Sequence, residues 1–444
     1  MTLKSFLHGI HPPDYKETTN HLPIQQFPFA PILIISLSQH IGAPAIAVVR
    51  EGQEVVRGEL LARADGYMSI PIHAPASGIV KKISLAPSVS GKMVPGIYLE
   101  PWPGSTQEVM EGEPCLLESA TPEQIITAIQ AAGIVGLGGA AFPTHAKITA
   151  PAEQQAHNHI DTLIINGIEC EPFLTTDHRV MLEQSDDIVL GIRYLLKACG
   201  AQHAIIAVEA NKRDAAEKLR SAIPQELPVK VELLAVKYPQ GAEKILIKAL
   251  LNKEIPTAQH ASAVHVLGVN VATCAEIGRL LPHGRGIQER VITIGGPAVK
   301  KPGNFRIPIG TPTRFVLDYL GVKDNISEVF FGGPMMGNAI ANLDNPVTKG
   351  TSGIIAFTGH ETGVTKNVSP CIHCGACVDA CPMRLNPSQL GLLAAKQQYQ
   401  TMIESFHLQE CFECGACSYV CPSHIPLVQI FRSAKAYVRK NKVA

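Results

Sequence analysis

The sequence predicts a multidomain α/β protein, and three observations point to that fold class. The chain has 444 residues, which is too long for one compact core, so two to four domains are expected. From about residue 121 onward, strand-like runs such as TLIING and HAIIAVEA alternate with helix-like runs, which is typical of an α/β domain with a largely parallel sheet. Eight of the twelve cysteines fall in two short runs near the C-terminus, which marks a separate small domain there.

The overall composition excludes some classes of function. Hydrophobic residues make up 46% of the chain, charged residues make up 17%, and the formal net charge is zero. Because there is no basic surplus to neutralise phosphates, nucleic acid is not expected as a partner. The apolar run Phe29–Leu37 is half as long as a membrane span requires, and the N-terminus lacks the apolar core of a signal peptide. We therefore expect a protein that stays in the cytosol.

The first domain is predicted over residues 1–115, where Pro, Gly, Val and Ile alternate in short strand-like pieces with frequent turns. Within it, Val48–Ala62 and Ile70–Ile83 resemble the two halves of the barrel-sandwich fold of biotinyl and lipoyl carriers. Such carriers present a modifiable lysine on the hairpin between the halves, whereas Arg63–Ser69 contains no lysine. The resemblance implies the scaffold without its swinging arm.

The second domain is predicted over residues 116–285 as a Rossmann-like α/β unit. The stretch Thr121-Pro-Glu-Gln124 places an N-cap, a proline and a glutamine ahead of an apolar helical face, and Gly133 ends that helix. Further helices are predicted over Val180–Cys199, Arg213–Ile223 and Gly241–Leu251.

The third domain is predicted over residues 286–363, which are again rich in strands and turns. The segment VITIGGPAVKKPGNFRIPIGTPTRFVLDYLG resembles the small β-grasp module named for soluble ligand binding (SLBB). The last domain is predicted over residues 364–444. The helical pattern LGLLAAKQQY between its two cysteine runs favours a helical domain over the hairpin spacer of compact bacterial ferredoxins.

Both cysteine runs have the form C-x2-C-x2-C-x3-C-P. In two-cluster ferredoxins of this pattern, the fourth cysteine of each run binds the other cluster. We therefore predict two [4Fe–4S] clusters with exchanged fourth ligands. The first would be held by Cys371, Cys374, Cys377 and Cys421, and the second by Cys411, Cys414, Cys417 and Cys381.

Alternative roles for the cysteines and for nearby residues fit the pattern less well. A structural zinc site would have cysteine pairs separated by a loop rather than two tight runs of four. His373, inside the first run, is expected to tune its cluster by hydrogen bonding rather than to bind it. The four scattered cysteines are expected to be small buried hydrophobic residues; they are Cys115, Cys170, Cys199 and Cys274.

A flavin is expected upstream of the clusters, because iron–sulfur clusters carry one electron at a time and a hydride donor delivers two. The candidate is the glycine-rich loop GIVGLGGAAFPTHAK, from Gly133 to Lys147. Its glycines allow backbone amides to approach a phosphate or a ring. The loop differs from the dinucleotide fingerprint G-x-G-x-x-G, and as a pattern alone it is equally compatible with a structural turn.

The strings GLGGAAFPTHAK, INGIECEPFLTTDHR, YPQGAEK and NVAT resemble the flavin-binding segments of the flavoprotein subunit of respiratory complex I. That resemblance implies non-covalent FMN and NAD(H) as substrate. The residues implied to contact FMN are Gly136, Gly138, Lys147, Asn166, Glu169, Tyr238, Gly241, Asn270 and Thr273. Those implied to line the nicotinamide nucleotide site are Gly139, Phe142, Glu171 and Glu243. Ile168, Ala242 and Val269 depart from the complex I pattern.

Over nearly the whole chain, the motifs GIHPPDYK, LSQHIGAPA, GLGGAAFPTHAK and INGIECEP, the β-grasp segment and both cysteine runs resemble the RnfC subunits of Rnf complexes, in that order. The resemblance implies a subunit of an ion-translocating ferredoxin:NAD+ oxidoreductase that pumps sodium ions or protons. It implies partners among the membrane subunits and the ferredoxin-like iron–sulfur subunits, and a peripheral place on the cytoplasmic side of the bacterial inner membrane, with indirect membrane association.

The resemblance also implies a mechanism in which hydride passes between NADH and the flavin, and electrons leave singly through the clusters. Lys147, with the amides of Gly138 and Gly139, would stabilise negative charge on the cofactor, and no general base is required. Two alternatives remain: a soluble flavin and iron–sulfur cobalamin reductase of a microcompartment, and a cluster-only adaptor with a vestigial flavin site.

The end of the chain is predicted to form a basic amphipathic helix that binds a partner or lies at a membrane interface, or else is simply solvated. Its basic residues are Arg432, Lys435, Arg439, Lys440 and Lys442.

Overall fold

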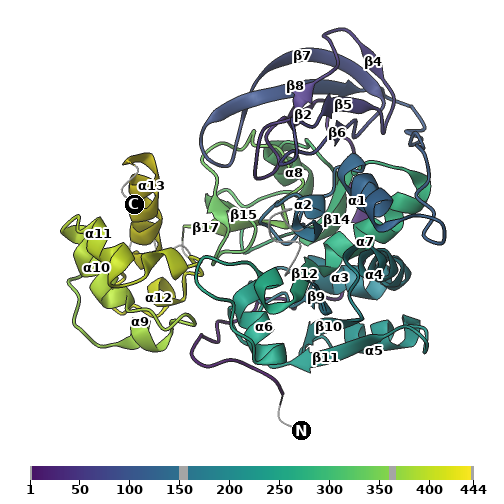
Figure 1. Ribbon diagram of the computed structural model, residues 1–444. Helices are drawn as coiled ribbons and strands as arrows, with labels where there is room; N and C mark the ends of the chain where they lie inside the picture. Colours follow the sequence, from purple (N-terminus) through teal and green to yellow (C-terminus); the bar gives the residue numbers. More distant parts are fainter. Residues whose placement is uncertain (1–2, 150–158, 360–366, 442–444) are drawn as a thin grey trace.

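The computed structural model describes residues 3–149, 159–359 and 367–441. It contains a barrel-sandwich domain, a central α/β domain, a β-grasp domain and a helical C-terminal domain, so the predicted fold class is confirmed. Figure 1 shows the C-terminal domain, in yellow, set to one side of the other three. In the described part of the chain, no helix is long and apolar enough to cross a membrane.

The barrel-sandwich domain consists of two antiparallel sheets around one apolar core. One sheet has the order β2 (Leu33–Ser36), β8 (Met93–Pro101), β7 (Gly78–Pro87) and β4 (Glu54–Val55), and the other has the order β3 (Ile46–Ala47), β5 (Leu60–Arg63) and β6 (Ile72–His73). Leu33, Leu61 and Val80 are fully buried between them. The hairpin without a lysine carries exposed Tyr67, whose hydroxyl donates to the carbonyl of Thr149 in the central domain at 3.3 Å.

The central domain is built on a parallel sheet in the order β11 (Val229–Leu234), β10 (His203–Glu209), β9 (Thr162–Gly167) and β12 (Val266–Asn270). Both faces of the sheet are buried, because alternate residues of β9 enter different cores. Leu163 and Ile165 face one core, whereas Ile164 faces the other. Such two-sided burial is typical of parallel sheets covered by helices.

The helices of the central domain follow the predicted pattern with one correction. Thr121 caps the first helix through a capping box, as predicted. The single helix predicted over Val180–Cys199 is wrong, because Gln184 has a non-helical backbone and Ser185-Asp186-Asp187 begins a new helix with an acidic first turn. The helices are α1 (Pro122–Ala131), α2 (Thr144–Ile148), α3 (Thr176–Glu183), α4 (Ser185–Cys199), α5 (Arg213–Ala222), α6 (Glu243–Leu251) and α7 (Val271–Leu280), with 3-10 turns η2 (Ala261–Val264) and η3 (Leu281–His283).

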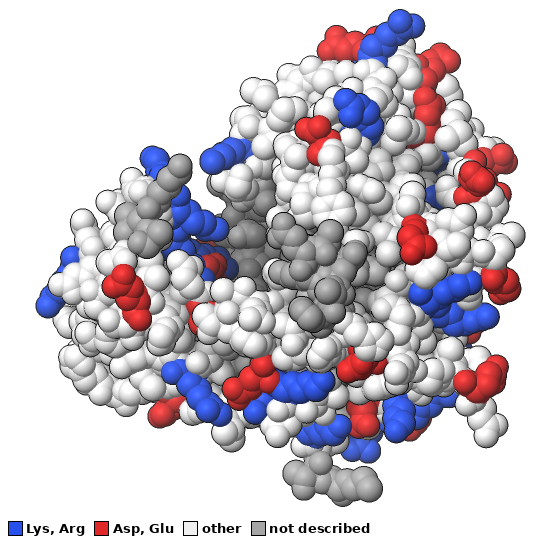
Figure 2. All heavy atoms as spheres, viewed as in Figure 1, with Lys and Arg blue, Asp and Glu red and all other residues white. Residues whose placement is uncertain are grey.

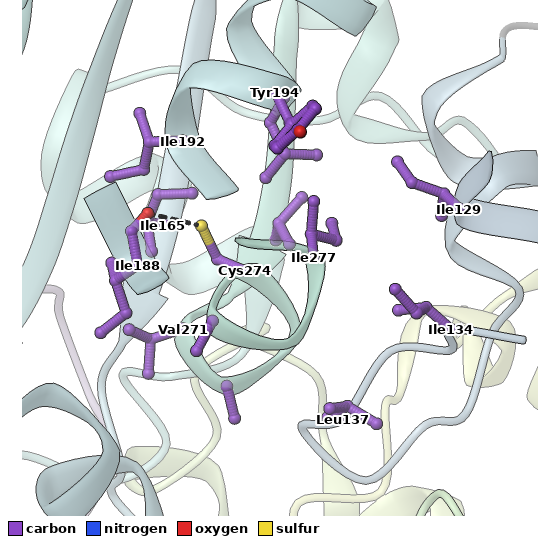
Figure 3. Packing of buried hydrophobic residues seen from close by; sticks show 14 of the residues in the cluster. Ile129, Ile134, Leu137, Ile165, Ile188, Ile192, Tyr194, Val271, Cys274 and Ile277 are labelled. Atoms are coloured by element: carbon purple, nitrogen blue, oxygen red, sulfur yellow. Dashed lines mark hydrogen bonds between the residues drawn. The ribbon is translucent and has the colours of Figure 1, made fainter. Parts of the chain in front are cut away.

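Helices α4 and α7 approach each other closely because glycines stand at their crossing. A Cβ atom on Gly191 would lie 2.0 Å from the carbonyl oxygen of Cys274, and one on Gly278 would lie 2.0 Å from that of Asp187. Figure 3 shows Cys274 packed among isoleucines of this core, with its thiol directed at the carbonyl of Ile188, 3.4 Å away. Among the scattered cysteines, Cys274 and Cys115 are buried as predicted, whereas Cys170 and Cys199 are only partly buried.

The β-grasp domain has a six-stranded mixed sheet in the order β1 (Ile24–Gln26), β14 (Gly303–Pro308), β13 (Glu289–Gly295), β17 (Gly353–Thr358), β15 (Ile326–Phe331) and β16 (Asn338–Ala339), packed against α8 (Thr313–Leu320). Strand β1 comes from the N-terminal segment and pairs in parallel with β14. The residues before β1 lie along the central domain, where Ile10 forms backbone hydrogen bonds with Tyr238. The N-terminal segment thus ties domains that are distant in sequence.

The C-terminal domain is helical, and the predicted helical spacer is present as α10 and α11. The two cysteine runs repeat the same backbone turns: His373 and Glu413 have φ of 55° and 63°, and Gly375 and Gly415 have φ of 80° and 79°. Each turn leads into one short helix. The elements are α9 (Ala376–Asp379), α10 (Pro387–Ala395), α11 (Tyr399–Glu404), η5 (Leu408–Glu410), α12 (Ala416–Tyr419) and α13 (Leu427–Asn441).

Helix α13, the predicted basic helix, packs against its own domain. Phe431 and Ala434 are buried. Arg432 and Lys435 form ion pairs with Glu413 of the second cysteine run, each at 3.1 Å, and Lys435 also donates to the carbonyl of Cys411. Figure 2 shows Lys and Arg side chains gathered beside the hollow between the C-terminal domain and the rest of the molecule. Two of the predicted basic positions are thus used within the chain; Lys442 lies outside the described residues.

Candidate functional site

A cavity of about 190 Å³ opens at the carboxyl ends of β9 and β12. These strands are neighbours, but the chain leaves β9 toward β10 on one side and returns to β12 on the other. Such a reversal of strand order is where open α/β sheets bind ligands. We call this the switch-point cavity. Its lining residues are Gly136, Gly138, Ala140, Phe142, Thr144, Lys147, Ile164, Asn166, Glu243, Leu246, Ile247, Gly268, Val269, Asn270 and Thr273.

The glycine-rich loop forms one wall of the switch-point cavity and is fixed from behind. The Leu137 amide donates to the Thr273 hydroxyl at 2.8 Å, and Arg290 donates to the Leu137 carbonyl at 2.8 Å. A Cβ atom on Gly138 would lie 3.4 Å from Asn270, and Gly139 has φ of 107°, a conformation that side chains disfavour. The loop therefore presents backbone to the cavity, as a phosphate or ring site requires.

Lys147 and Glu243 form an ion pair across the switch-point cavity, with 2.7 Å between Nζ and Oε1. Lys147 comes from α2 and Glu243 is the first residue of α6. Both side chains are more than a third exposed, so the pair is weak and an anionic ligand can displace Glu243 from Lys147 at little cost. The opposite wall needs a glycine at position 268, where a Cβ atom would lie 2.7 Å from Glu243 Oε1.

The two strand-end asparagines shape the switch-point cavity by holding the loops around it. Asn270 Oδ1 accepts hydrogen bonds from the amides of Ala272 and Thr273 at the start of α7, at 3.0 and 3.2 Å. Asn166 Nδ2 donates to the carbonyl of Gly241 at 2.9 Å. Their amide groups are thus already used within the chain, so any contact of theirs with a ligand comes through shape or a shared hydrogen bond.

Behind the asparagines lies a layer of buried charge. Asn270 Nδ2 donates to Asp177 at 2.7 Å, and Glu169 accepts from the Asp177 amide at 2.8 Å. Burial, reinforced by the neighbouring Glu169, raises the pKa of Asp177 to about 7. Arg290 lies near enough to oppose that shift. Glu169 therefore faces the start of α3 behind the cavity wall, where it orders the carboxylate that holds Asn270.

Of the thirteen residues predicted to bind FMN or NADH, eight line the switch-point cavity: Gly136, Gly138, Phe142, Lys147, Asn166, Glu243, Asn270 and Thr273. Gly139 is the chain neighbour of two lining residues. The other four lie elsewhere: Glu169, Glu171, Tyr238 and Gly241. The apolar wall made by Ile164, Leu246, Ile247 and Val269 was not predicted, although the apolar face of α6 and the run VLGVN could have indicated it.

Glu171 and Tyr238 point away from the switch-point cavity toward other domains. Glu171 accepts from the amides of Met335 and Met336 in the β-grasp domain, at 3.1 and 2.8 Å. The Tyr238 hydroxyl donates to the carbonyl of Cys414 at 2.6 Å. The loop turns this way because Lys16, from the N-terminal segment, donates to the carbonyl of Glu171 at 2.8 Å. The binding roles of these residues stay predictions.

The eight clustered cysteines surround two separate hollows in the C-terminal domain. The first hollow, of about 260 Å³, is lined by Cys371, Cys374, Cys377 and Cys421. The second, a narrower one of about 20 Å³, is lined by Cys381, Cys411, Cys414 and Cys417. Each hollow thus takes three cysteines from one run and the fourth from the other, which is the exchanged arrangement that the spacing predicts.

The disposition of these thiols suits clusters better than single ions. Among the described residues, no three His, Cys, Asp or Glu side chains are placed to hold one metal ion. The thiols instead stand around the walls of a hollow. Burial, followed by the neighbouring cysteines, raises the pKa of Cys414 to about 12, and burial also raises the pKa of Cys417 and Cys411. Thiolates are therefore costly here unless bound iron offsets their charge.

The three parts of the chain match known family models. Residues 4–102 match the RnfC barrel sandwich hybrid domain, residues 129–279 match the Nuo51 FMN-binding domain, and residues 370–425 match the 4Fe-4S dicluster domain. The RnfC subunit of the proton-translocating ferredoxin:NAD(+) oxidoreductase complex of Clostridium ljungdahlii is 40% identical over 98% of this chain and 94% of its own length. The chain belongs to the RnfC family of Rnf complex subunits.

Further relatives extend this assignment. The RnfC subunit of the Na(+)-translocating ferredoxin:NAD(+) oxidoreductase complex of Acetobacterium woodii is 38% identical over 86% of both chains. The corresponding subunit of an ion-translocating oxidoreductase complex of Haemophilus influenzae is 39% identical over 98% of this chain, which spans 66% of that relative. An NAD+-reducing [NiFe]-hydrogenase chain shares the fold, with a TM-score of 0.50 and 19% identity over 76% of this chain and 68% of its own.

The predicted cofactors follow from these matches. This member of the RnfC family has an FMN-binding domain and a domain for two [4Fe–4S] clusters, and it is a subunit of an oxidoreductase complex that performs electron transfer. The other subunits of that complex are its partners.

Proposed function

We propose that this chain is the NADH-interacting subunit of its Rnf complex and passes electrons between NADH, FMN, two [4Fe–4S] clusters and partner subunits. We place it on the cytoplasmic side of the bacterial inner membrane, held there by other subunits. The observation that carries the proposal is that a single chain combines a switch-point cavity in an FMN-binding domain with two hollows lined by four thiols each. A nicotinamide site and a route for single electrons thus belong to one subunit.

The residues around the switch-point cavity fit FMN and a nicotinamide nucleotide in their chemistry. Bound FMN supplies the exchange between the electron pair of NADH and the single electrons that iron–sulfur clusters carry. Lys147 releases Glu243 and supplies positive charge to the negative groups of the ligands. The backbone at Gly138 and Gly139 lets amide groups come close to a phosphate or a ring. The apolar wall at Leu246 excludes water from the ring.

The alternatives predict different things about this cavity. A cluster-only adaptor would have its flavin site closed by the residues that depart from the complex I pattern. Ile168 and Ala242 instead lie outside the lining of the switch-point cavity, and Val269 lines it without filling it. A microcompartment cobalamin reductase would share the domains, but the relatives that cover 98% of this chain are named as subunits of ion-translocating complexes.

The test is anaerobic reconstitution with iron, sulfide and FMN, followed by titration with NADH. We expect bleaching of the flavin absorbance and then electron paramagnetic resonance signals from reduced clusters. In Lys147→Glu, two carboxylates would face each other across the cavity, so FMN binding or its reduction by NADH should be lost while the cluster absorbance remains. Lys253→Glu, on the loop after α6, is the control. Unchanged flavin reduction in Lys147→Glu would contradict the role of Lys147, and failure of the wild-type protein to bind FMN would contradict the proposed function.

A further inference from the structure

The second hollow is attached to the central domain, whereas the first is not attached in the same way. The central domain reaches the second cysteine run through Tyr238, and Lys244 forms an ion pair with Glu410, directly before Cys411, at 2.7 Å. Tyr238, Ile10, Ala380 and Ala416 form one small apolar cluster at this junction. The second hollow is therefore held against the FMN-binding domain by apolar, polar and charged contacts together.

A short bonded path joins the switch-point cavity to the second hollow. Asn166, in the lining of the cavity, donates to the carbonyl of Gly241 at 2.9 Å. Three residues back along the chain is Tyr238, whose side chain is 1% exposed and whose hydroxyl donates to the carbonyl of Cys414 at 2.6 Å. Two hydrogen bonds and one tetrapeptide thus connect a wall of the flavin cavity to a predicted cluster ligand.

The first hollow has the opposite setting. Cys374 is exposed, and the apolar side chains beside it, Ile372 and Val368, are 66% and 60% exposed. Both hollows have the same turns in their cysteine loops, so the difference lies in what covers them. The first hollow opens to the surface of the molecule, and the second is closed by the central domain.

We propose that Tyr238 is a positioning residue that holds the second cluster against the FMN-binding domain. The cluster on Cys381, Cys411, Cys414 and Cys417 is then the inner one, next to the flavin, and the cluster on Cys371, Cys374, Cys377 and Cys421 is the outer one. In each transfer the reduced flavin loses one electron and the inner cluster gains one; two transfers, with the electrons supplied by NADH, return the flavin to its oxidised form. This inference rests on the proposed function and adds the order of the two clusters.

The hydroxyl of Tyr238 has two effects in this arrangement. It fixes the distance between the loop of Cys414 and the central domain. Its hydrogen also directs the positive end of a dipole at the carbonyl of a cluster ligand, which stabilises the more negative, reduced cluster. Removing the hydroxyl should therefore make the reduction potential of the inner cluster more negative and leave that of the outer cluster unchanged.

The experiment compares reconstituted wild-type protein with Tyr238→Phe, which keeps the ring and removes the hydroxyl. We expect unchanged FMN content and unchanged flavin reduction by NADH. The midpoint potential of one cluster should fall, and the rate of flavin-to-cluster transfer should drop on the order of tenfold, the low end of what removal of a hydrogen-bond partner costs at a metal ligand. Tyr419→Phe, which alters an exposed tyrosine of the same domain, should change none of these values.

The shifted cluster is assigned with Cys374→Ala, which removes a ligand of the outer cluster only. The inference holds if the potential that shifts in Tyr238→Phe belongs to the cluster that survives in Cys374→Ala. It is overturned if both potentials and the transfer rate stay unchanged, or if the shifted signal is the one lost in Cys374→Ala. Loss of flavin reduction in the wild-type protein would instead overturn the proposed function, so the two failures are distinct.

Discussion

The two cysteine runs have the same spacing and the same backbone turns, but they lie in different surroundings. The first run lines a hollow that opens to solvent beside exposed Ile372, and the second lines a hollow covered by the central domain at Tyr238. Local spacing therefore sets how each loop wraps a cluster, whereas contacts between domains set which cluster faces the flavin. Identical motifs in one chain need not have interchangeable roles.

The largest expected effect comes from breaking the exchange of ligands between the runs. Cys381→Ala removes the fourth cysteine of the first run, but that cysteine lines the second hollow. We expect loss of the cluster on Cys411, Cys414 and Cys417, about four iron atoms per chain, with the other cluster intact. Iron analysis and electron paramagnetic resonance check this.

Cys421→Ala is the matched variant, because its cysteine lines the first hollow. It should remove the cluster on Cys371, Cys374 and Cys377. If each substitution instead removed the cluster of its own run, the exchanged arrangement would be wrong.

A second prediction concerns pH, which should act on the covered side of the C-terminal domain. Burial raises the pKa of Glu171 from its ordinary value of 4.5 to about 7, although the amides of Met335 and Met336 oppose the shift. The folded state thus binds this proton more tightly than the unfolded chain does. Stability should therefore fall as pH rises from about 4.5 to about 7, by about 1–3 kcal/mol, and then level off.

Glu171→Gln cannot titrate and should remove this contribution, so its Tm should fall less than that of the wild type between these pH values. Glu226→Gln, at an exposed position, should retain the wild-type slope. Parallel Tm profiles for wild type and Glu171→Gln would show that the carboxyl is not buried between domains in this way.

The smallest effect is expected at the ion pair between Lys244 and Glu410, which lie 2.7 Å apart at the junction of the two domains. Both side chains are mostly buried, so a double-mutant cycle with alanine should give a coupling energy of about 1 kcal/mol. The exposed pair of Arg314 and Asp344, at 2.8 Å, should couple more weakly. Equal coupling in both pairs would indicate that the junction at Lys244 is as open to solvent as the surface.

Local features of the sequence predicted much of the fold. The capping box at Thr121 and the helical spacer between the cysteine runs are present, and the grouping of the thiols follows the exchange that Cys381 and Cys421 suggested. Each of these depends on residues close together in the chain or on a spacing that a cluster imposes. The break at Gln184 was missed, because an apolar periodicity runs through it and only the acidic turn after it marks a new helix.

Features that depend on distant segments were not predictable in the same way. Strand β1 joins the β-grasp sheet although it precedes the barrel-sandwich domain. Glu171 and Tyr238 belong to strings that resemble a flavin site, yet the N-terminal segment and the C-terminal domain draw them away from the switch-point cavity. A motif identifies the loop, and tertiary contacts decide where each of its side chains points.

The central claim, that the second cluster is the inner one, is tested most directly by reducing two matched variants with NADH. Cys377→Ala and Cys417→Ala each remove the third cysteine of one run, and each should lose one cluster. With FMN bound in both, NADH should still reduce the surviving cluster of Cys377→Ala at close to the wild-type rate, whereas the surviving cluster of Cys417→Ala should stay oxidised on that time scale. Fast reduction of the surviving cluster in Cys417→Ala, with slow reduction in Cys377→Ala, would contradict the account.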